Sequence, residues 1–63
     1  MMSKQKYKEE KIIKNGVELV IEYHPETYVK YRWQLVEYVG KIPFVEYADA
    51  RKKDILAYIE NNY

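Results

Sequence analysis

Hydrophobic and polar positions alternate along the first third of the chain and predict a β-hairpin. Asn15-Gly16 separates two segments rich in β-branched residues, and both residues tolerate the positive φ angles that a two-residue type I′ turn requires. Pairing across this turn places Ile12 opposite Leu19. In the second strand, the residues on the predicted buried face are Val17, Leu19, Ile21 and Tyr23.

Residues 28–39 fit either a strand or a helix. In a helix, Pro25 would lie near the first position and Gly40 at the C-terminal end, which would give a ββαα fold with residues 25–39 helical. We favour the strand because tyrosine, valine and tryptophan dominate the segment, and these residues prefer pleated surfaces. Periodicity leaves the helix as the alternative.

The last third of the chain predicts a turn, a short strand and a helix. Gly40-Lys41 is suited to a second tight turn, and residues 42–47 then form a strand that Pro43 places at an edge of the sheet. Asp49 is a suitable N-cap for a helix over residues 50–61. The residues predicted to face the core from this helix are Ile55, Leu56 and Ile59.

Together these elements predict an α+β fold, a small antiparallel β-meander of three to four strands with one C-terminal α-helix packed on one face. Residues 1–63 form a single domain, in which we expect residues 1–6 to be a mobile tail. Since one helix covers only one face of a sheet, the other face is open. The predicted covered face holds Val17, Leu19, Ile21, Tyr23, Val29, Tyr31, Trp33, Leu35, Ile42 and Phe44. The predicted open face carries Val20, Tyr28, Lys30, Arg32, Val36, Tyr38, Val45 and Tyr47.

Eight tyrosines in 63 residues are too many for so small a core. Each ring needs roughly 150–250 Å² of cover and a partner for its hydroxyl. Tyrosine at a surface is favoured in recognition, because the ring gives contact area at low entropic cost. The predicted open face combines three tyrosines with Lys30 and Arg32, and its three valines add apolar area. This composition indicates a binding surface.

The candidate catalytic and metal-binding residues are too few for an enzyme. There is no cysteine, Ser3 and Thr27 are the only serine and threonine, and the two glycines are isolated turn residues that form no phosphate loop. His24 lies between Glu22 and Glu26, but metal sites usually combine several histidine or cysteine ligands. We therefore expect a non-enzymatic protein without metal or other cofactor.

Charge and the N-terminal residues limit the partner and the location. Residues 1–10 are rich in lysine and glutamate without an apolar run, so we expect neither a secretory signal nor a membrane anchor, and a cytoplasmic location. Eleven basic and ten acidic residues give a net charge of +1. This balance is unlike that of proteins that coat nucleic acid through bulk charge, and it favours a protein partner.

These observations predict a small protein-binding module, either an inhibitor or adaptor that blocks a larger protein, of the sort that phages and mobile elements encode, or a homodimer. The alternative is binding of DNA or single-stranded nucleic acid, with rings stacked on bases and cations on phosphate. The predicted contact residues for either partner are Tyr28, Lys30, Arg32, Tyr38, Tyr47, Arg51, Lys52 and Lys53.

The helical alternative for residues 25–39 carries a resemblance to a known family. The residues involved are Thr27, Tyr31, Leu35, Tyr38, Gly40, Pro43, Phe44 and the run 54–59. With a helix at 25–39, they resemble the core-binding helical segment of tyrosine recombinases. The resemblance implies DNA binding, and it supports nucleic acid as the alternative partner.

Overall fold

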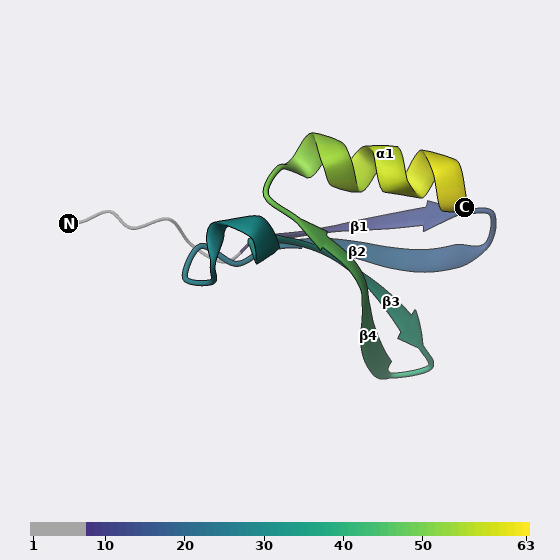
Figure 1. Cartoon of the computed structure of the whole chain (residues 1–63). Coiled ribbons are helices and arrows are strands. Elements are labelled where there is room, and N and C mark those ends of the chain that lie inside the picture. The colour runs from purple at the N-terminus through teal and green to yellow at the C-terminus, as the bar shows by residue number, and fades with distance from the viewer. Residues whose placement is uncertain (1–7) are drawn as a thin grey trace.

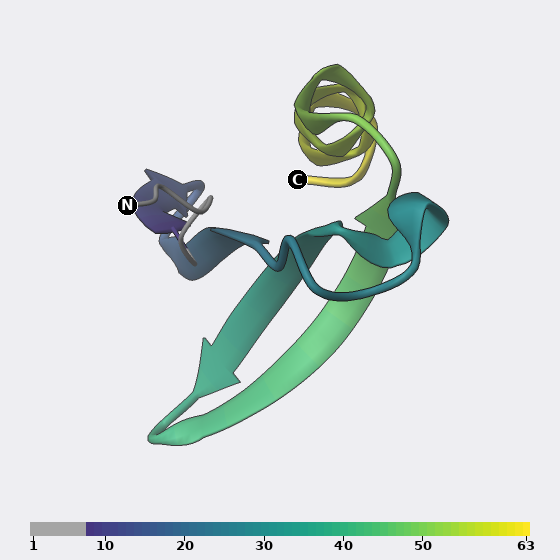
Figure 2. The same ribbon diagram turned by 90° about the vertical axis from the view of Figure 1, so that its left-hand side faces the viewer.

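The computed structural model describes residues 8–63, which form an antiparallel four-stranded sheet followed by a helix (Figure 1). The strands are β1 (Lys8–Lys14), β2 (Val17–Tyr23), β3 (Trp33–Val39) and β4 (Ile42–Asp49), and they lie side by side in chain order. Helix α1 (Lys52–Asn62) lies over one face of the sheet (Figure 2), and a short 3₁₀ helix, η1 (Val29–Tyr31), precedes β3. The predicted α+β meander with one C-terminal helix is confirmed. The expected tail at residues 1–6 lies outside the described residues.

Both tight turns form where the sequence predicts them. Asn15 and Gly16 have φ angles of 53° and 81°, as a type I′ turn requires. The turn sets the predicted register, with Ile12 opposite Leu19. Gly40, at φ 66°, lies in the turn between β3 and β4. Since β4 has a neighbour only on the β3 side, it is an edge strand, as predicted.

The core lies between α1 and the two central strands. Its buried residues are Leu19, Ile21, Leu35, Ile55 and Ile59. Burying such a side chain stabilises the fold by about 1.5–3 kcal/mol. Leu56, which was also predicted to face the core, is 42% exposed. Successive helical residues are about 100° apart around the axis, so Ile55 pointing at the sheet turns Leu56 to the flank of the helix.

Residues 24–32 form a loop, so the prediction of a strand beginning at Tyr28 is wrong. The His24 N–H donates to the Arg32 carbonyl at 2.7 Å, and the Tyr31 N–H donates to the Tyr28 carbonyl at 2.8 Å. Val29 and Tyr31, expected in the core, are exposed. The first β2–β3 pair is Tyr23 with Trp33. The residues before Trp33 cannot extend the pairing with β2, because the residues that would lie opposite them, from His24 onward, belong to the same loop.

The helical alternative for residues 25–39 is also wrong, because residues 33–39 form β3 in the middle of the sheet. The likeness to the core-binding segment of tyrosine recombinases depended on that helix. It therefore has no counterpart in the fold. The fold therefore gives no support to nucleic-acid binding, and only the charges and rings on the surface bear on it.

A β-bulge in β4 changes the side of the sheet that its later residues face. Tyr47 pairs with Leu35, while Val45 pairs with the next residue along β3, which leaves Glu46 as an extra residue. Tyr47 therefore faces α1, where its ring stacks on Tyr58 with 4.3 Å between centroids. The prediction that Tyr47 lies on the open face is wrong, because strict alternation from Val45 takes no account of the extra residue.

The prediction that Asp49 is the N-cap of α1 is wrong, because Asp49 is the last residue of β4. The N-cap is Arg51, which makes no side-chain cap bond. Asp49 instead accepts a hydrogen bond from the Tyr47 hydroxyl at 2.7 Å and another from the Ala50 N–H at 2.6 Å. The hydrogen bond from the Tyr47 hydroxyl is the largest cause that lowers the pKa of Asp49, and the bond from the Ala50 N–H is the next. The bond that Tyr47 donates to Asp49 also raises the pKa of Tyr47. These contacts fix the end of β4 and the residue that follows it.

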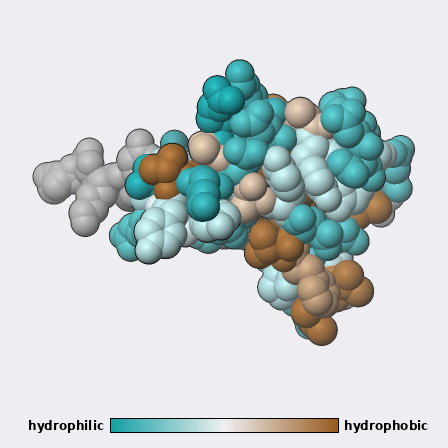
Figure 3. Space-filling model, viewed as in Figure 1, coloured by the Kyte–Doolittle hydropathy of each residue, from teal (hydrophilic) through white to brown (hydrophobic). Residues whose placement is uncertain are grey.

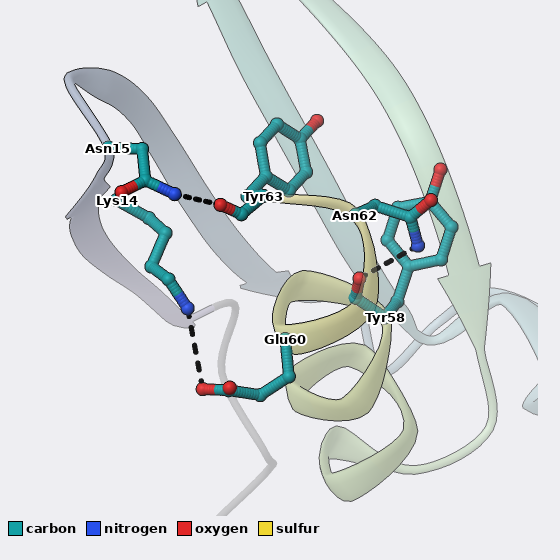
Figure 4. Close-up of polar contacts among 6 residues, drawn as sticks. All are labelled: Lys14, Asn15, Tyr58, Glu60, Asn62 and Tyr63. Atoms are coloured by element: carbon teal, nitrogen blue, oxygen red, sulfur yellow. Dashed lines mark hydrogen bonds and ion pairs between the residues drawn. The ribbon is translucent and has the colours of Figure 1, made fainter.

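The C-terminal end of α1 is bonded to two parts of the sheet, and Figure 4 shows the contacts at the first of them, the β1–β2 turn. At the β1–β2 turn, Asn15 donates from its side-chain amide to the backbone oxygen of Tyr63, and Lys14 pairs with Glu60 at 3.4 Å. At β3, the Tyr63 hydroxyl donates to Glu37 Oε1 at 3.0 Å. The helix thus runs from the end of β4 toward the β1–β2 turn.

The free energy of unfolding should decrease as the pH rises from about 10 to about 12. Burial and the hydrogen bond to Glu37 raise the pKa of Tyr63 to about 12, whereas a tyrosine in the unfolded chain ionises near pH 10. Within this window the unfolded state has lost the proton that the folded state retains, so stability falls with pH. Urea denaturation at a series of alkaline pH values measures the loss.

The matched variants are Tyr63→Phe and Tyr28→Phe. The first removes the titrating hydroxyl and should show a smaller alkaline loss than the wild type. Part of the loss should remain, because the raised pKa of Tyr47 acts in the same direction. Tyr28→Phe removes an exposed hydroxyl from the loop and should behave like the wild type. Identical alkaline losses in all three proteins would contradict the assignment to Tyr63.

Candidate protein interface on the β3–β4 hairpin

The eight predicted contact residues do not share one face. Tyr38 is on β3, on the face away from α1, and Tyr47 is on the α1 side. The loop holds Tyr28, Lys30 and Arg32, and the start of α1 holds Arg51, Lys52 and Lys53. Because the loop leads into β3 and α1 follows β4, these six lie at the end of the sheet where Trp33 pairs with Asp49. The predicted set is therefore divided between two faces and one end of the molecule.

Three of the five cations at that end already have a partner. Arg32 Nε donates to a carbonyl of its own loop at 2.9 Å. Arg51 forms an ion pair with Asp54 at 3.3 Å, and Lys52 forms one with Glu10 at 2.8 Å. The other two cations are Lys30 and Lys53. Carboxylates therefore offset the charges of Arg51 and Lys52, whereas Arg32, bonded to a neutral carbonyl, keeps its charge.

The face away from α1 offers less apolar area than predicted. Val20 and Val36 are only 2% exposed. They pair with each other on the two central strands, so side chains of both outer strands flank them.

A hollow of about 230 Å³ on this face is lined by Glu9, Lys11, Glu18, Val20, Tyr38 and Gly40. This volume is below the roughly 300–1,000 Å³ of most small-molecule sites.

The β3–β4 hairpin projects beyond the part of the sheet that α1 covers (Figures 1 and 2). Four apolar residues near its turn are 48–60% exposed, namely Val39, Ile42, Phe44 and Val45. Figure 3 shows hydrophobic residues gathered over this hairpin at the lower edge of the molecule. We call these four residues the hairpin patch. Contiguous exposed apolar patches on proteins are associated with interaction sites, which makes the hairpin patch the candidate interface.

Ile42 and Phe44 were predicted to lie in the core, and the direction of α1 explains why they do not. The helix ends beside Asn15 and Lys14 at the β1–β2 turn, whereas the β3–β4 hairpin curves out from under it (Figure 1). Its 11 residues span about 16 Å, whereas a strand of seven residues is about 23 Å long. A comparison of these two lengths in the sequence would have shown that part of the sheet stays uncovered.

Val39, Ile42 and Phe44 lie on the α1 side of the hairpin. Phe44 pairs with Glu37, and the Glu37 carboxylate accepts a hydrogen bond from the Tyr63 hydroxyl at the end of α1, so both residues face α1. Val39 and Ile42 pair with each other two residues further along the strands and share this side. Val45 lies on the other side, where it pairs with Val36. The hairpin patch therefore wraps around both sides of the projecting turn.

The described residues show no other chemical site. His24 Nε2 lies 2.8 Å from Glu22 Oε1 and ties the loop to β2. Within residues 8–63 no three histidine, cysteine, aspartate or glutamate side chains are grouped so that they could hold a metal ion. No helix in this part of the chain is long and apolar enough to cross a membrane. Comparison of the chain with protein-family models, curated proteins and solved structures found no match.

Proposed function

We propose that this chain is a small non-enzymatic protein-binding module that contacts its partner through the β3–β4 hairpin. The observation that supports this function is the hairpin patch, four apolar side chains that project from the body of the domain in contact with water. Removing apolar surface from water is favourable by about 25 cal/mol for each Å², from which the entropic cost of association is subtracted. Phe44, the aromatic member, is the expected anchor. An inhibitor or adaptor that blocks a larger protein would act by such a contact.

The partner contacts side chains of the hairpin and does not add a strand to its edge. Strand addition needs a continuous row of free N–H and C=O groups along β4. Pro43 has no N–H, and the bulge at Glu46 interrupts the row. Of the predicted contact residues, only Tyr38, which pairs with Pro43, lies in the part of the hairpin between the bulge and the β3–β4 turn.

Site-specific crosslinking tests this function. A photoreactive phenylalanine analogue at position 44 should form an adduct with a protein when the chain is irradiated in the cells that produce it. The mass of the adduct shows whether the partner is a different protein or a second copy of the chain. Replacing Ile42 by serine should reduce the adduct at least severalfold, because the patch loses an apolar side chain next to the anchor.

The matched control is the same analogue at position 56. Leu56 is exposed to a similar extent as Phe44, 42% against 48%, but it lies on α1. A protein adduct formed from position 44 and not from position 56 supports the proposal. Equal adducts from both positions, or none from position 44, would refute it.

Nucleic-acid binding is the second candidate function, and the end of the sheet that carries the loop and the start of α1 favours it. Five cations gather there beside the exposed rings of Tyr28 and Tyr31, and Lys30 Nζ lies 5.3 Å from the Tyr31 ring centroid. Retention on immobilised single- and double-stranded DNA at about 50 mM salt tests this function, because phosphate contacts are strong at that salt concentration. Absence of retention rules it out, and retention that is lost in a Lys30→Gln, Lys53→Gln variant supports it.

A further inference from the structure

Two carboxylates border the hairpin patch on its α1 side. Glu37 pairs with Phe44 across the two strands, so both side chains leave the same face of the sheet. Glu46 is the extra residue of the bulge. It follows Val45 of the hairpin patch directly in β4, and Glu37 accepts the Tyr63 hydroxyl bond at 3.0 Å. Burial and that hydrogen bond raise the pKa of Tyr63, and the negative charges of Glu37 and then Glu46 add to the rise. The apolar residues thus have an acidic border toward α1.

No cation of residues 8–63 neutralises this border. Glu37 accepts its hydrogen bond from the uncharged Tyr63 hydroxyl, and neither Glu37 nor Glu46 is within 4 Å of a described lysine or arginine nitrogen. Lys14, at the neighbouring turn, is paired with a carboxylate of α1. Lys41 lies in the β3–β4 turn, at the other end of the patch. The surface is therefore acidic beside α1, apolar in the middle and basic at its tip.

We propose that the hairpin binds a protein segment whose apolar residues cover Phe44 and Ile42 and whose lysine or arginine side chains meet Glu37 and Glu46. This inference rests on the proposed function and specifies the chemistry of its partner. Two carboxylates covered by an apolar surface would lose hydration without compensation, whereas a cation forms charge-assisted hydrogen bonds with them. Complementary charge also excludes wrong partners and sets the orientation of the segment.

The same charges disfavour two other occupants of this side. A second copy docked by a two-fold axis that passes through the acidic border would set Glu37 and Glu46 against the same carboxylates of its partner. A nucleic acid would bring phosphates to an acidic border. Both arrangements place like charges together, and this costs binding energy.

A pair of synthetic peptides tests the charge preference directly. They have the same length, the same number of leucines and the same Gly-Ser spacers, and they differ only in having lysine or glutamate at one end. Each is titrated into the ¹⁵N-labelled full chain, and the amide signals are followed by NMR. We expect the lysine peptide to shift amides of residues 37–46 and to bind at least severalfold more tightly than the glutamate peptide. Its affinity should decrease as the salt concentration rises.

Three charge-neutralising variants locate the preference. Glu37→Gln and Glu46→Gln should each weaken the lysine peptide about two- to fivefold, the size of an exposed ion pair. Glu37→Gln keeps an oxygen that accepts the Tyr63 bond. The Glu46 side chain is exposed and forms no side-chain hydrogen bond among residues 8–63, so Glu46→Gln tests the charge alone. Glu26→Gln, which changes the net charge equally in the 24–32 loop, is the control and should leave the affinity unchanged.

The outcomes separate this inference from the proposed function. If both peptides shift the hairpin amides with equal affinity, or if Glu46→Gln and Glu26→Gln behave alike, the basic partner is refuted while an apolar hairpin contact stands. If the lysine peptide shifts no amide of residues 37–46, the inference is also refuted, and the crosslinking from position 44 then decides the function independently.

Discussion

Replacing Ile55 by alanine should reduce the free energy of unfolding by about 2–5 kcal/mol, the usual cost of truncating a fully buried isoleucine. Ile55 has no exposed surface and packs from α1 onto Leu19 and Leu35. A domain of this size without disulfides has a total stability of about 3–5 kcal/mol. The variant should therefore be largely unfolded at room temperature. Circular dichroism and the fluorescence of Trp33 during urea denaturation measure the change.

The adjacent residue on the helix provides the control. Leu56→Ala removes a side chain of the same volume from the flank of α1, where it is 42% exposed. Alanine also has the higher helix propensity, so the expected loss is below about 1 kcal/mol. If the two variants were equally destabilised, α1 would have to pack on the sheet through a different face from the one described.

Replacing Tyr47 by alanine should cost about 2–3 kcal/mol. The change removes a large ring that packs against the core, where burial of such a side chain is worth about 1.5–3 kcal/mol, and the stack on Tyr58, worth about 0.5–1.5 kcal/mol. It also removes the hydrogen bond to Asp49. The tyrosine ring is only half-buried, so the total is smaller than for a tyrosine in the centre of a core. Urea denaturation of the variant at neutral pH measures the loss.

Val45→Ala is the control for the β-bulge. Val45 is two residues before Tyr47 and would share its face in a regular strand, but it is 60% exposed on the other side of the hairpin. Truncating it should cost less than about 1 kcal/mol, the range of β-propensity. If Val45→Ala and Tyr47→Ala lowered the free energy of unfolding equally, both residues would face the same side of the sheet. That result would contradict the assignment of a bulge at Glu46.

Local rules predict the parts of the fold in which neighbours along the chain decide the conformation. Asn15-Gly16 determines the first hairpin and its register, because the positive φ angles of a type I′ turn leave few other arrangements. Pro43 correctly predicts an edge strand, since it cannot donate within a ladder. The spacing of Ile55 and Ile59 predicts the helix and its buried side.

The prediction that contact residues share one open face of the sheet is wrong in part, because it depended on counting alternate residues through two segments that are not regular strands. Tyr28, Lys30 and Arg32 lie in a loop that a propensity for strands could not reveal, since no partner strand remained for them. Tyr47 lies on the opposite side from the prediction because of one extra residue in β4. Tyr38 keeps its predicted face, and its role in binding stays a prediction.

The sequence by itself determined the order of the strands, the two turns and the C-terminal helix, because each depends on residues within about one element of each other. Only the tertiary structure decided which surface stays open. The hairpin patch is exposed because α1 is tethered through Asn15 and Glu37 along a path that leaves the β3–β4 turn uncovered (Figure 1). Those contacts join residues far apart in the chain, and no local pattern of hydrophobic and polar positions records the direction in which a helix crosses its sheet.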